Sequence, residues 1–260
     1  MSDIHFKSGY SAVNGLNMYY EIYGEGKPLV LMHGGGSTIQ TTFGNIIPLL
    51  SKQRQVIAVE LQAHGRTGDR STDLSFEQDA DDVATLLDNL NIPNADFLGY
   101  SNGGQTLIEI ALRHPAMANK LIIASAFYKR SAAVPEFWKG FDNATIDVMP
   151  QALRDGFLKV NNDANALHNM FNKDVQRMKN FQDWSHEQIQ SIKAPTLIIN
   201  GNNDVGSVEH AVEMFNTFPE SQLAILPGKH GTYIGAVEFL ENGEWKQHYV
   251  VDIINDFLDQ

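Results

Sequence analysis

The stretch DFLGYSNGG, residues 96–104, carries the strongest fold signal in the sequence. Residues 96–100 have the apolar pattern of a buried strand, and residues 103–113 have a helical spacing that ends before Pro115. Ser101 is therefore expected on a strand-to-helix turn, inside a Gly-x-Ser-x-Gly motif that keeps its neighbours small. Such a turn exposes the hydroxyl near a helix N-terminus, so we predict a nucleophilic serine. The alternative is an ordinary serine in a glycine-rich turn.

Outward from this turn, short apolar runs alternate with helical patterns, which predicts an α/β fold with a mostly parallel central sheet and helices on both faces. The start differs, because Asn14-Gly15 between two strand-like runs is a strong hairpin signal. Strands are expected at residues 10–13, 16–23, 29–32, 55–61, 96–100, 120–125, 196–200 and 222–226. Helices are expected at residues 76–90, 103–113, 208–218 and 248–258.

The motif HGGG, residues 33–36, directly follows a predicted strand. Acyl transfer develops negative charge on a carbonyl oxygen, and backbone N–H groups must point at that oxygen. Glycines let the backbone approach it closely. We predict an oxyanion hole formed by the N–H groups of Gly35 and Asn102, with Gly34 or Gly36 as substitutes for Gly35. A phosphate loop is the rival interpretation, but neither G-x-x-x-x-G-K-[ST] nor G-x-G-x-x-G occurs here.

A serine nucleophile needs a base, and we assign that role to His230 among the nine histidines. His230 lies in the loop PGKHG directly after the last predicted strand. That is the carboxyl end of the sheet, where Ser101 also emerges and where open α/β sheets build their sites. His33 and His64 belong to glycine-flanked turns, and we expect them to hold loops through hydrogen bonds.

The base in turn needs a carboxylate that orients it, and Asp204 is the best candidate. Asp204 follows the predicted strand at residues 196–200, again at the carboxyl end of the sheet. The position after the preceding strand, which some hydrolases use for this acid, reads Ala-Phe-Tyr-Lys at residues 126–129 and holds no acid. The alternative role for Asp204 is the N-cap of the helix that begins near Ser207.

These motifs, and the chain order serine, aspartate, histidine, resemble the α/β-hydrolase superfamily. The resemblance covers residues 15–126 and 194–260, and it includes the turn YGEGKP. The stretch ELQAHGRT, residues 60–67, is similar to the family's D-x-x-G-H-G-x-[ST] turn. Glu60 and Ala63 depart from that pattern, at positions that usually shape a loop.

The resemblance implies a hydrolase core at residues 1–126 and 191–260 and a helical lid at residues 127–190. This lid segment is rich in aromatic and Met side chains, some of which could line an apolar acyl or alcohol pocket, with Trp138 as the first candidate. Packing of the lid onto the core is the expected role of most of them. The side chains in question are Phe137, Trp138, Phe141, Met149, Phe157, Met170, Phe171, Met178, Phe181 and Trp184.

The residues together predict a serine hydrolase, without cofactor or metal, that cleaves small or medium, largely apolar carboxylic esters through an acyl-enzyme. The HGGG loop also resembles that of carbon–carbon bond hydrolases of ring-cleavage products, so diketone-like substrates are an alternative. In that subclass an asparagine usually precedes the nucleophile, whereas this chain has Tyr100. Ser101 argues against the relatives that use an aspartate nucleophile. A small-molecule receptor on a hydrolase scaffold is a further alternative.

The composition narrows the expected partners. The 260 residues carry a formal net charge of −12, which disfavours nucleic acids and anionic membranes. The chain has no cysteine, which excludes disulfides and thiolate catalysis. No N-terminal basic region precedes an apolar run, and no uncharged apolar stretch approaches the ~20 residues that span a bilayer. We therefore expect a cytoplasmic protein whose partner is a small ester-like molecule.

Overall fold

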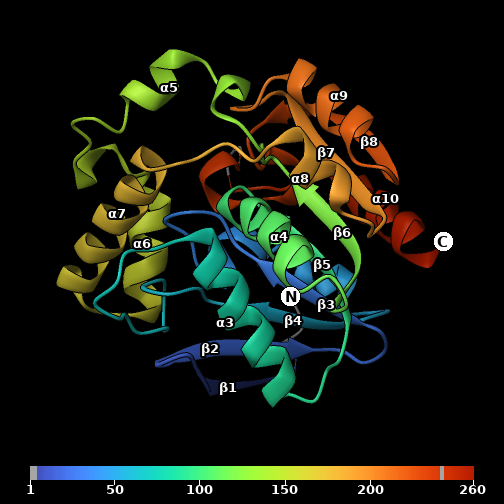
Figure 1. Ribbon diagram of the computed structural model, residues 1–260. Coiled ribbons are helices and arrows are strands. Elements are labelled where there is room, and N and C mark those ends of the chain that lie inside the picture. The colour runs from blue at the N-terminus through green and yellow to red at the C-terminus, as the bar shows by residue number, and fades with distance from the viewer. Residues whose placement is uncertain (1–4, 241–242) are drawn as a thin grey trace.

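The structure, a computed structural model, describes residues 5–240 and 243–260. Its centre is an eight-stranded sheet with the order β1-β2-β4-β3-β5-β6-β7-β8, covered by helices on both faces (Figure 1). Strand β2 pairs antiparallel with β1 and β4, and the other neighbours are parallel. The strands are β1 (Phe6–Val13), β2 (Leu16–Tyr23), β3 (Pro28–Met32), β4 (Gln55–Val59), β5 (Ala95–Tyr100), β6 (Ala118–Ala124), β7 (Thr196–Asn203) and β8 (Ser221–Lys229).

Local sequence explains both the hairpin and the buried strands. Asn14 and Gly15 have φ values of 45° and 81°, which give the turn a twist that matches the two strands. In β3, Leu29 and Leu31 face one side of the sheet, and Val30 and Met32 face the other. All four are fully buried, as expected for a parallel strand covered on both faces.

The flanking helices form two layers, each with its own hydrophobic cluster. Helices α3 (Phe76–Asn89), α4 (Asn102–Arg113) and α9 (Val208–Thr217) cover one face. Helices α1 (Ile39–Phe43), α2 (Ile47–Leu50) and α10 (Tyr249–Asp259) cover the other. The four predicted helices are confirmed to within one residue at each end. Strand β8 continues to Lys229, beyond its predicted end at residue 226, and His230 is the next residue.

Between β6 and β7 lies a mostly helical segment, which we call the insertion (residues 127–190). It contains the 3-10 turns η1 (Arg130–Ala132) and η2 (Ile146–Val148), the helices α5 (Pro135–Lys139), α6 (Gln151–Val160) and α7 (Ala164–Lys179), and all but the last residue of α8 (His186–Ser191). Asp163 caps α7 by accepting hydrogen bonds from two N–H groups of its first turn. Helices α6 and α7 pack side by side around Phe157 and Met170 (Figure 1).

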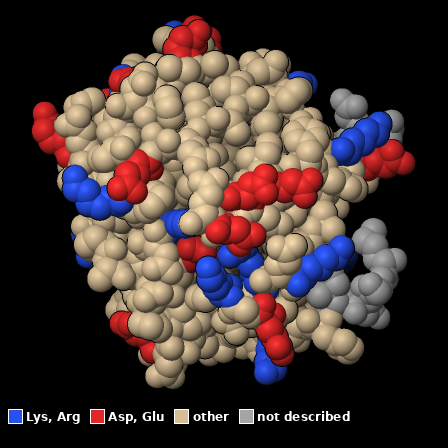
Figure 2. Space-filling model, turned by 90° about the vertical axis from the view of Figure 1, so that its right-hand side faces the viewer, with Lys and Arg blue, Asp and Glu red and all other residues tan. Residues whose placement is uncertain are grey.

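After β8 come the short 3-10 turns η3 (Thr232–Ile234) and η4 (Val237–Phe239), which lead into α10. Across the described ranges, 5–240 and 243–260, no helix is both long enough and apolar enough to cross a membrane. The chain has 31 acidic and 19 basic side chains. On the face shown in Figure 2 the two kinds lie interspersed over the surface.

Candidate active site

Ser101 occupies a strained turn between β5 and α4. Its φ of 52° and ψ of −122° lie in a region that costs a non-glycine residue about 1–3 kcal/mol. Two glycines make the turn possible, because a Cβ at Gly99 would lie 2.2 Å from the Gly103 carbonyl oxygen. A Cβ at Gly103 would lie 2.1 Å from the Met32 carbonyl oxygen. The Gly-x-Ser-x-Gly spacing thus lifts the serine hydroxyl clear of the sheet.

The structure brings together the three side chains that the sequence singled out. His230 Nε2 lies 3.1 Å from Ser101 Oγ, and His230 Nδ1 donates a hydrogen bond of 2.6 Å to Asp204 Oδ1. They come from the carboxyl ends of three parallel strands, β5, β8 and β7. The Asp204 side chain is fully buried, whereas that of His230 is 18% exposed. Ser101 and His230 both line one cavity, so a substrate bound there contacts both groups.

Asp204 is held as a carboxylate by four donors. Besides His230, these are Ser125 Oγ at 2.6 Å and the backbone N–H groups of Gly201 at 2.9 Å and Val205 at 2.7 Å. Burial alone would raise the pKa of Asp204, but the hydrogen bonds and the attraction of His230 outweigh it, and the pKa lies below its usual range. The N-cap of α9 is Ser207, which accepts from the N–H of His210. Asp204 therefore does not cap that helix.

Ser125 contributes to this site although sequence reasoning passed over it. It stands at the end of β6 with a φ of 51°, and its Oγ also lies 2.6 Å from Tyr233 Oη. This is the strand after which some hydrolases carry the acid. A serine here reaches the Asp204 carboxylate of the neighbouring strand instead. A short polar residue at the end of a strand next to the predicted acid was the available signal.

The HGGG loop lies against Ser101, with one difference from the prediction. A Cβ on Gly35 would meet the Asn102 side chain at 2.6 Å, so the two predicted oxyanion donors are neighbours. Within the described residues, the N–H groups of Gly35 and Asn102 make no hydrogen bond, and each is available to a substrate. The N–H of Gly36 donates to Asp174 Oδ2 at 2.6 Å. Gly36 is therefore occupied and is not a substitute donor.

The two loop histidines hold backbone groups, as predicted. In the HGGG loop, His33 Nδ1 lies 2.8 Å from the Gly34 carbonyl oxygen, and Nε2 accepts from the N–H of Leu61. This pattern requires a neutral ring, and burial lowers the pKa of His33 to about 3. In the turn at residues 60–67, His64 Nδ1 lies 2.8 Å from the Gln62 carbonyl oxygen.

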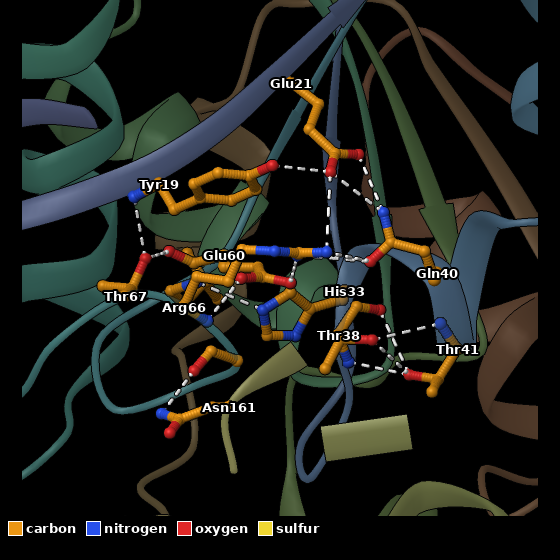
Figure 3. Close-up of polar contacts among 12 residues, drawn as sticks. Tyr19, Glu21, His33, Thr38, Gln40, Thr41, Glu60, Arg66, Thr67 and Asn161 are labelled. Atoms are coloured by element: carbon orange, nitrogen blue, oxygen red, sulfur yellow. Dashed lines mark hydrogen bonds and ion pairs between the residues drawn. The ribbon is translucent and has the colours of Figure 1, made fainter. Parts of the chain in front are cut away.

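The turn at residues 60–67 accommodates both departures from the family pattern, and Figure 3 shows the contacts of Glu60 with Arg66. Glu60 accepts from the backbone N–H of Arg66 at 2.6 Å and pairs with Arg66 Nη1 at 2.7 Å. A Cβ on Gly65 would lie 2.4 Å from the Glu60 carboxylate. Ala63 has a φ of 65°, which explains why a glycine is typical there. Both residues shape the turn, away from Ser101.

A cavity of about 280 Å³ opens above Ser101 and His230. The insertion supplies most of its apolar wall, including Phe137, Phe141 and Phe171. Among the described residues around the cavity, Asp174 is the one carboxylate, and no lysine or arginine lines it. The apolar lining residues from the insertion are Phe127, Phe137, Phe141, Val148, Met149, Pro150, Leu153, Phe171, Val175 and Met178.

Trp138, the first candidate for the pocket wall, is not among the lining residues. Its indole lies against Phe181 and below the Arg130 guanidinium, and its Nε1 donates to the Arg130 carbonyl oxygen. That prediction was wrong because neighbouring residues of the short helix α5 point in different directions. Phe137, one residue earlier, does line the cavity. In the described part of the chain, no group of three or more His, Asp and Glu side chains could hold a metal ion.

Comparison with known proteins supports this fold. A family model described as alpha/beta hydrolase fold matches residues 27–148. A meta-cleavage product hydrolase from Pseudomonas fluorescens IP01 has a similar solved structure, with a TM-score of 0.78, 22% identity and 98% of each chain covered. These findings define the class of fold, and the chain has the α/β-hydrolase fold.

Sequence relatives point to more than one activity. The 2-hydroxymuconate semialdehyde hydrolase of Pseudomonas sp. strain CF600 is 34% identical over 105 residues, which are 38% of this chain and only 36% of that protein. The pimeloyl-[acyl-carrier protein] methyl ester esterase of Nitrosospira multiformis is 27% identical over 243 residues, with 82% of this chain and 90% of that protein covered. The chain is therefore similar both to an esterase and to a hydrolase of semialdehyde substrates.

Proposed function

We propose that this chain is a serine hydrolase of neutral carboxylic esters with apolar acyl or alcohol groups. The observation that carries the proposal is the hydrogen-bonded series from Asp204 through His230 to Ser101, at the base of an apolar cavity. A protein that only bound small molecules would have no use for a strained serine aligned with a histidine and a buried carboxylate. A receptor on this scaffold is therefore the weaker candidate.

The residues have defined roles in this proposal. Ser101 Oγ attacks the ester carbonyl carbon while His230 Nε2 takes the hydroxyl proton, and the N–H groups of Gly35 and Asn102 hold the oxyanion. His230 then returns the proton to the leaving alcohol, and the acyl group stays on Ser101. Water attacks the acyl-enzyme with the same histidine as base, which releases the acid. Asp204 fixes the histidine tautomer and stabilises the imidazolium throughout.

The cavity favours a neutral substrate. Ion pairs and hydrogen bonds to arginine or lysine are the usual means by which proteins bind a carboxylate, and the described residues around this cavity include neither. Its one carboxylate, that of Asp174, is already paired with His64 and Arg177 and offers a substrate carboxylate no positive charge. The 24% identical relative from Metapseudomonas resinovorans is named for a dienoic acid substrate. The absence of a cation among the described residues of the cavity therefore favours hydrolysis of neutral esters over hydrolysis of acidic substrates.

Cleavage of carbon–carbon bonds in diketone-like compounds is the second candidate. It is supported by the similar solved structure of a meta-cleavage product hydrolase, which covers nearly the whole chain. Both reactions use a serine, a histidine and an oxyanion hole. They differ in the group that leaves. Among the described residues, the lining of the cavity includes no lysine or arginine to bind an acidic leaving group.

A panel of p-nitrophenyl esters, run beside a vinylogous diketone acid, tests the proposal. We expect turnover of the esters, little of the diketone acid, and one fluorophosphonate adduct on Ser101. Ser101→Ala should lower kcat by about 10⁴ to 10⁶. An adduct on another serine, or near-normal turnover by Ser101→Ala, would contradict the mechanism. Faster turnover of the diketone acid than of any ester would favour the second candidate.

A further inference from the structure

Asp174 connects the insertion to the HGGG loop. It lies on α7, 138 residues away from Gly36 in the sequence, and its Oδ2 accepts the Gly36 N–H at 2.6 Å. Asp174 is only 9% exposed and borders the cavity near Gly35, where a Cβ would approach the same Oδ2 at 3.3 Å. The insertion thus contributes a charged side chain to the loop that carries one of the two proposed oxyanion donors.

Two cations compensate this buried carboxylate. His64 Nε2 lies 2.9 Å from Asp174 Oδ2, and Arg177 Nη2 lies 2.6 Å from Oδ1. Because the other His64 nitrogen faces the Gln62 carbonyl oxygen, both ring nitrogens face acceptors, and only the imidazolium satisfies both. Arg177 also pairs with Asp79 of helix α3 at 2.7 Å. The four side chains, His64, Asp79, Asp174 and Arg177, therefore balance in charge and join the core to α7.

The two peptide groups that flank Gly35 are held by different parts of the molecule. The carbonyl oxygen of the Gly34–Gly35 peptide faces His33 Nδ1 at 2.8 Å, a contact made within the core. The N–H of the Gly35–Gly36 peptide donates to Asp174, a contact made by the insertion. A run of three glycines has more backbone freedom than any other tripeptide, so its orientation depends on such contacts. Without the second contact, the Gly35 N–H would be fixed from one side only.

We propose that Asp174 is a positioning residue that completes the oxyanion hole from the insertion, by fixing the Gly35–Gly36 peptide. The proposal rests on the proposed function, because it concerns the developing oxyanion. Asp174 acts through the loop and does not touch the reacting atoms. His64 and Arg177 have the complementary task, since an uncompensated carboxylate near the oxyanion would oppose the charge that develops there. The oxyanion hole is then complete only when the insertion is packed against the core.

The test compares Asp174→Ala with Lys173→Ala, its neighbour on α7. Lys173 Nζ also joins the insertion to the core, through Asp69 at 2.8 Å and the Arg70 carbonyl oxygen at 2.7 Å, but it does not contact the HGGG loop. We expect Asp174→Ala to lower kcat for a neutral ester by about 10- to 100-fold, somewhat less than the loss of a whole oxyanion donor, with little change in KM. Lys173→Ala should leave both constants near the wild-type values.

Two further measurements separate positioning from a general structural role. A trifluoromethyl ketone, whose adduct with Ser101 carries an oxyanion, should bind Asp174→Ala more weakly by about the factor lost in kcat. Asp174→Asn, which keeps an acceptor for the Gly36 N–H, should recover part of the loss and gives a second variant if Asp174→Ala does not fold. The proposal is overturned if both Asp174 variants match Lys173→Ala in kcat, or if only KM changes. Failure of the wild-type protein to label at Ser101 would instead refute the proposed function.

Discussion

At the residue scale, the environment of Asp204 gives the sharpest kinetic expectation. Its oxygens accept from four donors, and His230 is the one that links it to Ser101. Asp204→Asn should lower kcat by about 10⁴, because an amide allows His230 to adopt the wrong tautomer. Since Ser207 caps α9, the variant keeps that cap and should remain folded at the assay temperature. Steady-state kinetics and a thermal melt on one preparation check both parts, and a near-normal kcat would contradict the assignment.

His64 gives an expectation for stability against pH. Burial opposes its charged form, but the carboxylate of Asp174 outweighs burial and raises the pKa of His64. A raised folded-state pKa adds stability that is fully present below the unfolded value of about 6.5 and disappears as the pH rises through the folded value. The wild-type protein should therefore exceed His64→Gln in unfolding free energy by more near pH ~5 than near pH ~9. Denaturant melts at the two pH values measure this, and an equal or opposite difference would refute a charged His64.

At the scale of the element, helix α5 offers a matched pair of neighbouring aromatics. Phe137 lines the cavity, whereas Trp138 packs against Phe181 and Arg130 outside it. Phe137→Ala should move the preferred acyl chain to longer esters, by about fourfold in kcat/KM for each additional buried methylene at roughly 0.8 kcal/mol. Trp138→Ala should leave the chain-length profile unchanged. A p-nitrophenyl ester series from acetate upward is the measurement, and identical profiles for both variants would show that Phe137 does not limit the pocket.

Elements differ in how much of their role the sequence could predict. The turn at Ser101 was predictable, because glycine spacing and the strand-to-helix pattern are local. The role of Asp174 was not, since its partner Gly36 lies in a distant loop and only the folded chain brings them together. One signal was present on α7, where Asp174 and Arg177 share the buried face with Leu167 and Met170. Two charges on an apolar helical stripe suggest a buried ion pair, although not its partners.

At the scale of the whole molecule, the strand order determines where the site lies, because the parallel strands β5, β7 and β8 bring its three side chains to the same edge of the sheet. The sequence was sufficient for the α/β class, the hairpin and the helices of the core, because hydrophobic periodicity and turn residues determine them locally. It was insufficient for the insertion, in which the directions of the aromatic and Met side chains depend on packing. The mistaken choice of Trp138 has this cause, whereas Ser125 lies at the end of β6, outside the insertion. Both depend on which neighbours the fold supplies.

Near its two ends the insertion is joined by a backbone hydrogen bond, in which the N–H of Trp184 donates to the Tyr128 carbonyl oxygen at 2.9 Å. The backbone positions at which residues 129–183 leave and rejoin the core are therefore neighbours, so this segment can be exchanged as a unit. Doubling the length of such a closed segment costs only about 0.6 kcal/mol in loop entropy, so the core tolerates replacements of very different size. A segment grafted from another hydrolase should change the substrate range without disturbing the sheet. To keep the full rate it would have to bring its own acceptor for the Gly36 N–H.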